Sequence, residues 1–415
     1  MATAPNTRRI PFTESQKKIL LALAIAVGLR MLGLFLVLPV FTLYGLQFTS
    51  SRFLVGLALG CYGLAMAATE LPLGRLSDRI GRRKVLILGM SVFSLGSLLC
   101  AMPAWLPRSF EIGGLIFGRF VQGIGAITAT AFATVSDTIP PERRSTAMAV
   151  LGIPIGASFI LGVVLGPMLA GRFGTPSLFW LTGALGLVTV WLLARYLPDI
   201  PPRAAAPAPL RQVLRQRTVL MFDCGGFLMN TFMASFWFYF PLIVTGRHGL
   251  GMTEYYTILI PMLFVSAATM FAFSAGADRG GGQWLAATAF LILAVSALLL
   301  FRPASVGLNP NHLSSVVIPG TLFLIGFTGL EPILPSLVSQ SAPPNAYGTA
   351  LGSFHTLQYL GSAAGGALAG ELSHFPPAYV MTALMAASLL GLVLMLAQPK
   401  RPGSRAGSPA GRVQP

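Results

Sequence analysis

The chain has 415 residues, of which 54% are hydrophobic and only 10% are charged. Soluble domains carry about 25% charged residues, so the composition excludes an ordinary soluble globular protein. The net charge of +16 does not indicate nucleic-acid binding, because the basic residues are scattered over short segments between apolar runs. The three cysteines all fall inside apolar runs, so they predict neither a disulfide nor a metal site.

Apolar runs long enough to cross a membrane follow one another along the chain. A transmembrane helix needs about 20 apolar residues. Twelve runs meet this length: 19–45, 54–74, 85–103, 113–136, 145–170, 177–197, 218–244, 255–275, 284–301, 314–337, 347–369 and 377–397. The sequence therefore predicts an all-α membrane protein with twelve transmembrane helices.

The twelve runs divide into two halves of six. The first half covers 19–197 and the second 218–397, and the segment between them, 198–217, is rich in proline and arginine, as linkers are. A polar segment (1–18) precedes the first half, and a basic tail (398–415) follows the second. We expect two six-helix bundles joined by a cytoplasmic linker.

Lysine and arginine are concentrated in every second connecting segment. If the N-terminus is cytoplasmic, the outside segments hold only five basic residues: Arg52, Arg108, Arg172, Arg247 and Arg302. Cytoplasmic loops of membrane proteins carry the excess of positive charge. This bias predicts a multi-pass protein of the cell (inner) membrane with both termini in the cytoplasm, and its basic face lies next to anionic lipid.

A short cationic block separates the second and third runs. It reads Gly74-Arg75-Leu76-Ser77-Asp78-Arg79-Ile80-Gly81-Arg82-Arg83-Lys84. The pattern Gly-x-x-x-Asp-Arg-x-Gly-Arg-Arg resembles the loop signature of the major facilitator superfamily of transporters. A degraded copy, Asp278-Arg279-Gly280-Gly281, follows the eighth run. The resemblance implies two pseudo-symmetric bundles with a substrate site at their interface, as in other repeat-built transporters.

Two further motifs extend this resemblance. The fourth run contains Arg119-Phe120-Val121-Gln122-Gly123-Ile124-Gly125-Ala126, similar to the family's Arg-x-x-Gln-Gly-x-Gly-Ala. The fifth resembles Gly-x-x-x-Gly-Pro-x-x-Gly-Gly through Gly162, Gly166, Pro167 and Gly171, with Ala170 in place of a glycine. That motif is associated with the antiporter branch, although such glycines also simply let helices approach closely.

The similarity is closest to the YajR-like group of drug exporters. It rests on 29–40 in the first run and on 329–337 in the tenth. Glu70 departs from the pattern, because the resemblance implies an uncharged polar residue there. One alternative is that Glu70 pairs with the arginines of the nearby loop.

Four charged residues lie inside runs that the resemblance assigns to the central cavity. Arg30 and Arg119 lie in the first and fourth runs, and Asp223 and Glu331 in the seventh and tenth. Each costs about 2.5–3.5 kcal/mol to insert, so we expect a role in function: opposite charges would face one another across the halves. The alternatives are that the arginines are structural and that Asp223 snorkels to the cytoplasm.

Other polar and aromatic residues complete the predicted cavity. Gln122, Asn230, His355 and Gln358 are candidate hydrogen-bonding groups, and His355 is alternatively a packing residue. The aromatic residues of the seventh run, 232–240, are expected to face lipid or the membrane interface. The alternative is a cavity face with Met233 and Phe236, which would suit a lipophilic substrate.

The resemblance implies a proton-coupled exporter of small lipophilic or drug-like molecules. Proton coupling is assigned to Glu331, Asp223 and Glu70. A conformational latch is assigned to Gly74, Asp78, Arg79, Gly81, Arg82, Arg83 and Asp137. In this latch Asp78 faces the eleventh span and Arg82 bridges to Asp137.

Two other functions stay open, an uptake permease for a small metabolite and a non-transporting membrane scaffold or receptor. No pattern of an enzyme active site occurs in the sequence. We expect a monomer in membrane lipid that binds a small-molecule substrate and protons, with no cofactor, metal or nucleic acid.

Overall fold

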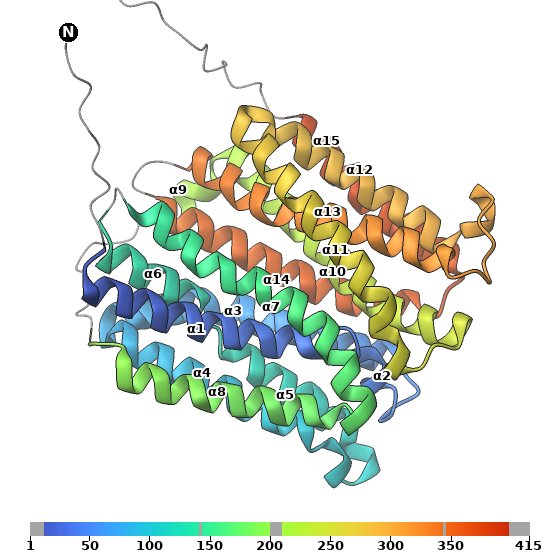
Figure 1. The fold of residues 1–415 in the computed structure, drawn as a ribbon, viewed down its shortest axis with the longest axis horizontal. Coiled ribbons are helices and arrows are strands. Elements are labelled where there is room, and N and C mark those ends of the chain that lie inside the picture. The colour runs from blue at the N-terminus through green and yellow to red at the C-terminus, as the bar shows by residue number, and fades with distance from the viewer. Residues whose placement is uncertain (1–11, 141–142, 200–209, 343–345, 398–415) are drawn as a thin grey trace, which may run out of the picture.

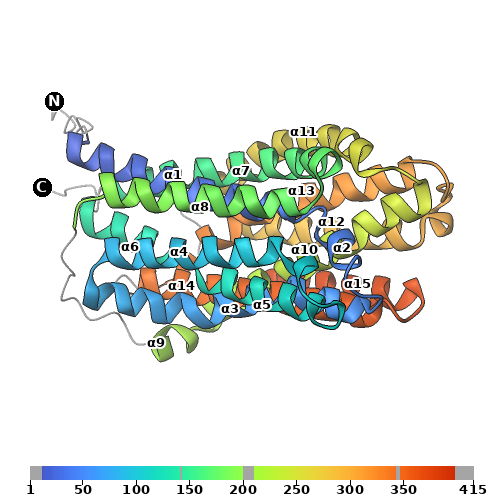
Figure 2. The same cartoon turned by 90° about the horizontal axis from the view of Figure 1, so that it is seen from below.

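The computed structural model describes residues 12–140, 143–199, 210–342 and 346–397. Within these residues the chain forms helices and no strands. The long helices lie side by side along one axis of the molecule (Figures 1 and 2). The predicted tail (398–415) lies outside the described residues, as do parts of the N-terminal segment and of the linker.

The N-terminal half contains the first six spans. Its helices are α1 (Glu14–Val37), α2 (Phe41–Gly45), α3 (Arg52–Ile80), α4 (Arg82–Ala101), α5 (Glu111–Ile124), α6 (Thr128–Thr138), α7 (Arg144–Phe173) and α8 (Pro176–Tyr196). Thr13 begins α1 with a capping box, in which its side chain accepts from the Gln16 backbone and the Gln16 side chain accepts in return.

Two spans of this half are interrupted, so the prediction of unbroken helices over 19–45 and 113–136 is wrong. The first span stops after Val37 and restarts at Phe41, next to Pro39, which has no N–H to donate to the helix. The fourth span stops at Ile124 and restarts at Thr128. Gly125, in this second break, packs so closely on α4 that a Cβ atom would lie 2.5 Å from the Gly89 carbonyl oxygen.

The C-terminal half contains the other six spans. They are α10 (Arg217–His248), α11 (Met252–Gly276), α12 (Gly282–Phe301), α13 (Ser314–Ser341), α14 (Tyr347–Leu372) and α15 (Pro377–Leu396). The described part of the predicted linker forms one short helix, α9 (Leu210–Leu214). Its Val213 is fully buried.

The predicted number of twelve transmembrane helices agrees with this fold. Ten stretches are long and apolar enough to cross a membrane, and one of them, Glu254–Phe301, contains both α11 and α12. These two helices run together through Ala277–Gly281, where Gly280 has a φ of 91°. The twelfth, α14, is rich in glycine and polar residues. It nevertheless packs between a helix of its own half and a helix of the other half. Gly361 touches the Phe227 carbonyl of α10, and Gly366 lies against Gly60 of α3.

The two halves lie on opposite sides of the molecule, with α3, α7, α10 and α14 along their boundary (Figure 1). The closest contact joins α3 and α14. A Cβ atom at Gly60 would lie 2.5 Å from the Ala363 carbonyl oxygen, and one at Gly63 would lie 2.6 Å from the Tyr359 carbonyl oxygen. The backbones of two helices from different halves therefore touch directly.

Candidate substrate and proton site

The break in the fourth span creates a binding point for a carboxylate. The first turn of α6 has backbone N–H groups without helical partners, and the helix dipole favours an anion there. The Glu70 side chain of α3 occupies this place: its Oε1 accepts a hydrogen bond of 2.6 Å from the Ala129 N–H. Glu70 is only 1% exposed. Its partner is thus the broken helix, and the alternative pairing with the loop arginines is wrong.

Arg30 of α1 lies in the same buried region. Its guanidinium donates to Thr128 Oγ1 and to Tyr62 Oη, each at 3.3 Å. It also interacts electrostatically with Glu70. Its Nε is buried without a partner. Arg30 is therefore held by neutral acceptors, and the acid that balances its charge belongs to its own half.

Arg119 of α5 adjoins this group through Tyr62. Its guanidinium carbon lies 4.4 Å from the centre of the Tyr62 ring, and its Nη1 donates to Gln122 Oε1 at 2.5 Å. Gln122 in turn donates to Ser97 Oγ at 2.8 Å. No ion pair of Arg119 occurs among the described residues. Cation–π contacts of this kind contribute about 2 kcal/mol when desolvated.

These residues form one unit, which we call the N-half polar cluster. Its members are Arg30, Tyr62, Glu70, Arg119, Gln122 and Thr128, all of them buried. Formal charges sum to +1 when Glu70 is ionised, from two arginines and one glutamate. Sequence reasoning missed Tyr62 and Thr128, although a tyrosine in the middle of an apolar run is a usable signal because membrane tyrosines concentrate at the interfaces.

The intramembrane acids of the C-terminal half form no ion pair among the described residues. Asp223 of α10 is fully buried, and its Oδ2 accepts from Ser353 Oγ of α14 at 2.8 Å, while Oδ1 has no partner. The alternative that Asp223 snorkels to the cytoplasm is therefore wrong. In this conformation the described residues contain no ion pair between Asp223 or Glu331 and the two arginines of the other half.

The Glu331 side chain of α13 is accessible to solvent. It lies four and eight residues after Phe327 and Phe323, so these three side chains share one face of the helix. Phe327 contacts Phe159 of α7 with ring centres 6.0 Å apart. The face that carries Glu331 is therefore turned towards the other half.

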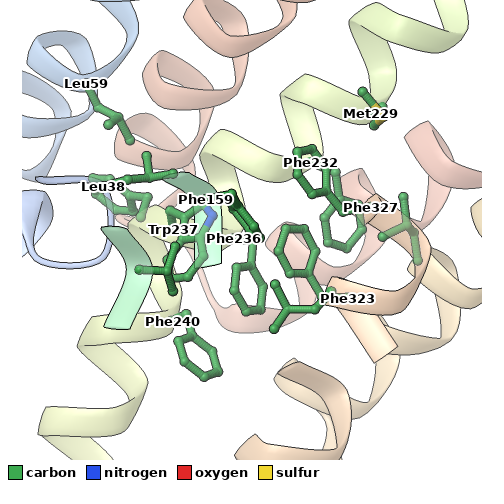
Figure 3. Packing of buried hydrophobic residues seen from close by; sticks show 14 of the residues in the cluster. Leu38, Leu59, Phe159, Met229, Phe232, Phe236, Trp237, Phe240, Phe323 and Phe327 are labelled. Carbon is green, nitrogen blue, oxygen red and sulfur yellow. The ribbon is translucent and has the colours of Figure 1, made fainter. Parts of the chain in front are cut away.

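An aromatic cluster lies beside this face (Figure 3). Phe236 stacks on Phe323 with ring centres 3.7 Å apart, and Trp237 contacts both rings edge-on. All aromatic residues of 232–240 are buried. The expectation that they face lipid or the membrane interface is therefore wrong, because these rings pack inside the protein. The physical reason is that Phe323 and Phe327 of α13 and Phe159 of α7 offer rings on the inner side of the helix. Pairs of aromatic side chains stabilise a structure beyond the burial of their surface.

The remaining predicted cavity residues lie on the inner helices of the C-terminal half. Asn230 donates to the Gly226 carbonyl of its own helix at 3.3 Å. Met233 packs on the buried core. His355 Nδ1 and Gln358 Oε1 are 2.9 Å apart, and the His355 ring stacks 6.4 Å from Phe132 of α6.

The predicted ion pair of the loop is present. Arg82 Nε lies 2.9 Å from Asp137 Oδ2 at the end of α6, and another of its nitrogens lies 2.7 Å from Asp78. Gly81 turns the chain between α3 and α4 with a φ of 99°, a conformation that favours glycine. Arg83 contacts the Ala194 carbonyl and Asp199. Arg79 is exposed, and a Cβ atom added at Gly74 would meet no described atom within 4 Å.

The glycine motif of α7 packs on the first span. A Cβ atom at Gly162 would lie 2.6 Å from the Phe35 Cβ, and Gly166 touches the Leu36 carbonyl oxygen. Pro167 is buried beside them, whereas Gly171 is exposed. The first two glycines thus bring α7 against α1 close to the point where the first span breaks.

The chain matches the Major Facilitator Superfamily over residues 23–366 and belongs to this family. It is 30% identical over 370 residues to the inner membrane transport protein YajR of Escherichia coli K12, covering 87% of this chain and 78% of that one. It is 29% identical over 269 residues to the multidrug resistance protein MdtL of Klebsiella pneumoniae, covering 62% and 60%. These relatives confirm the YajR-like resemblance.

Solved structures share the fold. A D-xylose–proton symporter superposes with a TM-score of 0.73 at 16% identity, covering 92% of this chain and 98% of that one. The human organic anion transporter MFSD10 superposes with a TM-score of 0.68 at 19% identity, covering 92% and 99%. Its membership of the Major Facilitator Superfamily makes the protein a multi-pass membrane transporter for small molecules. Members of this family are not enzymes.

Proposed function

We propose that the protein is a proton-coupled exporter that moves small lipophilic or drug-like molecules by alternating access. The observation that carries the proposal is the placement of two carboxyl groups in the C-terminal half, Asp223 and Glu331, neither of which forms an ion pair with a residue that the structure describes. A carboxyl group without a cation can take up and release a proton as the access to water changes. Exchange of that proton for substrate is antiport.

The substrate class follows from the aromatic cluster. Phe236, Phe323 and Phe327 lie along the helices that meet the other half, and Met233 packs nearby. Large apolar rings bind apolar or aromatic molecules through burial of surface, about 25 cal/mol per Å². Asn230, His355 and Gln358 supply the few polar groups that orient a ligand.

Glu331 is the first candidate for the coupling residue. It is exposed towards the interface and has no fixed partner among the described residues, so it can meet both a proton and a substrate. Asp223 is the second, because Ser353 bonds one of its oxygens and leaves the other free. Glu70 is the third and differs from both in being anchored to α6.

Two observations support export as the direction of transport. One is the glycine motif of α7, and the other is the similarity to MdtL, a multidrug resistance protein. An uptake permease is the second candidate, because a shorter match, 32% identical over 139 residues, is the riboflavin transporter RibZ of Clostridioides difficile. A non-transporting scaffold has no observation in its favour.

The test is transport in everted membrane vesicles with an imposed proton gradient. The panel consists of ethidium, rhodamine 6G, norfloxacin, chloramphenicol and riboflavin. Accumulation of at least one compound that stops when the gradient is collapsed is the expected result. Uptake of riboflavin into right-side-out vesicles, with no gradient-driven accumulation in everted ones, would favour the permease.

The proposed orientation has both termini in the cytoplasm of the inner membrane. Reporter fusions at Gly403 and within 201–209 should both report a cytoplasmic location. A periplasmic signal at either position would contradict the orientation. A monomer is proposed as the working unit, and its mass in detergent can be measured by light scattering.

A further inference from the structure

One side chain of the C-terminal half reaches the N-half polar cluster. Tyr359 belongs to α14, yet it packs against a buried core whose other members, such as Tyr62 and Met66, belong to the N-terminal half. Its phenol contacts the Thr128 side chain and interacts electrostatically with Glu70 and Arg30. The close approach of α3 and α14 at Gly63 brings it there, because the Tyr359 backbone lies directly against that glycine.

The cluster that Tyr359 meets depends on a single acid. Among the described residues, Glu70 is the one carboxylate of a cluster that holds two buried arginines, so its protonation changes the formal charge of the cluster from +1 to +2. Arginine stays protonated in proteins. In a region of low dielectric such a change has a large electrostatic effect. The cluster therefore cannot keep the same arrangement in both states of Glu70.

Thr128 connects that change to Tyr359. It begins α6, one residue before Ala129, whose N–H is bonded to Glu70. Arg30 donates to the Thr128 hydroxyl, which the Tyr359 phenol also contacts. Loss of negative charge on Glu70 removes the anion from the start of α6 and leaves the charge of Arg30 without its electrostatic counterpart. Both effects act on Thr128, the residue that the Tyr359 phenol contacts.

We propose that Tyr359 is the positioning residue through which the C-terminal half senses the charge of Glu70. With Glu70 ionised, the phenol holds α14 against α3 and α6. With Glu70 protonated, this hold weakens and the two halves separate at the end of α14 nearest to Tyr347. The inference rests on the proposed proton coupling and deepens it, because it assigns a residue that transmits the proton signal across the interface.

The test must account for the polar groups that surround Glu70 on the helices packed around it. They are Arg30 from α1, Tyr62 from α3, Thr128 and the Ala129 N–H from α6, and Tyr359 from α14. His355 lies one turn from Tyr359, and their rings stack 6.3 Å apart. Because His355 also titrates, a His355→Gln variant is needed to separate its contribution.

The experiment measures the distance between the ends of α3 and α14. Spin labels are placed at Arg75→Cys and Gly348→Cys, two exposed positions, in the full chain with its three native cysteines replaced by alanine. Double electron–electron resonance in lipid nanodiscs then gives the distance distribution at acidic and at alkaline pH. The matched control is Tyr239→Phe, which removes a phenol bonded to the Ala369 carbonyl within the C-terminal half.

The parent and Tyr239→Phe should shift between two distributions with pH. Glu70→Gln should keep the acidic distribution at both values. Tyr359→Phe should reduce the pH-dependent change in the population ratio about tenfold, because it removes the polar contact of the phenol with Thr128. His355→Gln should shift as the parent does. The inference is overturned if the parent shows no shift, if Glu70→Gln still responds to pH, or if Tyr359→Phe responds as the parent does.

Transport distinguishes this inference from the proposed function. If no compound of the panel is driven by the proton gradient but the distances still depend on Glu70 and Tyr359, the exporter proposal fails and the sensing role stands. If transport is gradient-driven in both the parent and Tyr359→Phe to the same extent, and the distances agree, the sensing role fails alone.

Discussion

The two halves share one architecture but hold their buried charges in opposite ways. In the N-terminal half, Arg30 and Arg119 surround Tyr62, and Glu70 is bonded to the start of α6. In the C-terminal half, Asp223 is bonded to one serine and Glu331 to no described residue. The interior of the C-terminal half contains stacked aromatic rings, such as those of Phe236 and Phe323, where the N-terminal half contains its polar cluster.

This difference separates two uses of an intramembrane charge. Breaking a buried pair by removing one partner costs about 3–5 kcal/mol, so the cluster of the N-terminal half is tied to folding. An acid without a cation can lose its charge by protonation at no such cost. The N-terminal half therefore holds Glu70 in a polar frame whose contacts respond to its charge, and the C-terminal half holds acids that change charge without breaking such contacts.

The largest effect is expected for the two acids of the C-terminal half that form no ion pair with a described residue, Glu331 and Asp223. Glu331→Gln should abolish gradient-driven accumulation of panel compounds but keep ligand binding, because the amide resembles a protonated acid. Asp223→Asn should show a comparable loss, since Asp223 is fully buried. The measurement is vesicle transport with and without the gradient. Glu371→Gln, an exposed acid at the end of α14, is the control.

If Glu331→Gln still responds to the gradient as the parent does, Glu331 is not the coupling residue. Asp223 or Glu70 would then take that role. If it were Glu70, the acid bonded to α6 and not the unpaired acids of the C-terminal half would couple transport to protons.

The second effect concerns stability. Arg30→Gln should lower the free energy of unfolding by about 3–5 kcal/mol, because it leaves the Glu70 carboxylate buried without its cation. Adding Glu70→Gln should recover part of this loss. Thermal unfolding in detergent measures both variants. Asp223→Asn should change stability by only about 1 kcal/mol, since Ser353 can donate to an amide oxygen as well. Equal losses of unfolding free energy for Arg30→Gln and Asp223→Asn would contradict the difference between the polar cluster of the N-terminal half and the unpaired acids of the C-terminal half.

A smaller effect is expected at the contact between the halves. Gly60→Ala places a Cβ atom 2.5 Å from the Ala363 carbonyl oxygen, so α3 and α14 must move apart. Overpacking of this kind costs about 1–3 kcal/mol, which corresponds to a loss of the closed state, and of transport, of about fivefold to more than a hundredfold. Gly152→Ala is the control, because nothing lies within 4 Å of it. Parent-like transport by Gly60→Ala would show that this contact is not part of the cycle.

The smallest effect concerns the proposed latch. Asp78→Asn should reduce transport while leaving expression near normal. Asp137→Asn should reduce it more, because the Asp137 side chain is 14% exposed and that of Asp78 is 37% exposed. Exposed ion pairs contribute about 0–1 kcal/mol. Vesicle transport, normalised to the amount of protein in the membrane, measures both variants. Unchanged transport by Asp78→Asn would contradict the latch.

The sequence by itself determined the membrane class, the twelve spans, the two halves and the family. These properties are local or additive. Each span is a run of apolar residues whose length is set by the thickness of the bilayer. The loop around Asp78 is a contiguous motif, and its expected pair between Arg82 and Asp137 is present. The charged positions Arg30, Arg119 and Asp223 were also visible, because a charge inside an apolar run stands out.

Only the tertiary structure decided which groups these charges meet. Glu70 and the Ala129 N–H are 59 residues apart, and they meet because the fourth span breaks beside Gly125. The rotation of α10 turns Phe236 inward, and the approach of α3 to α14 carries Tyr359 into the other half. Hydropathy does not encode these outcomes, because helix rotation, helix breaks and close approach are set by packing between segments distant in the chain.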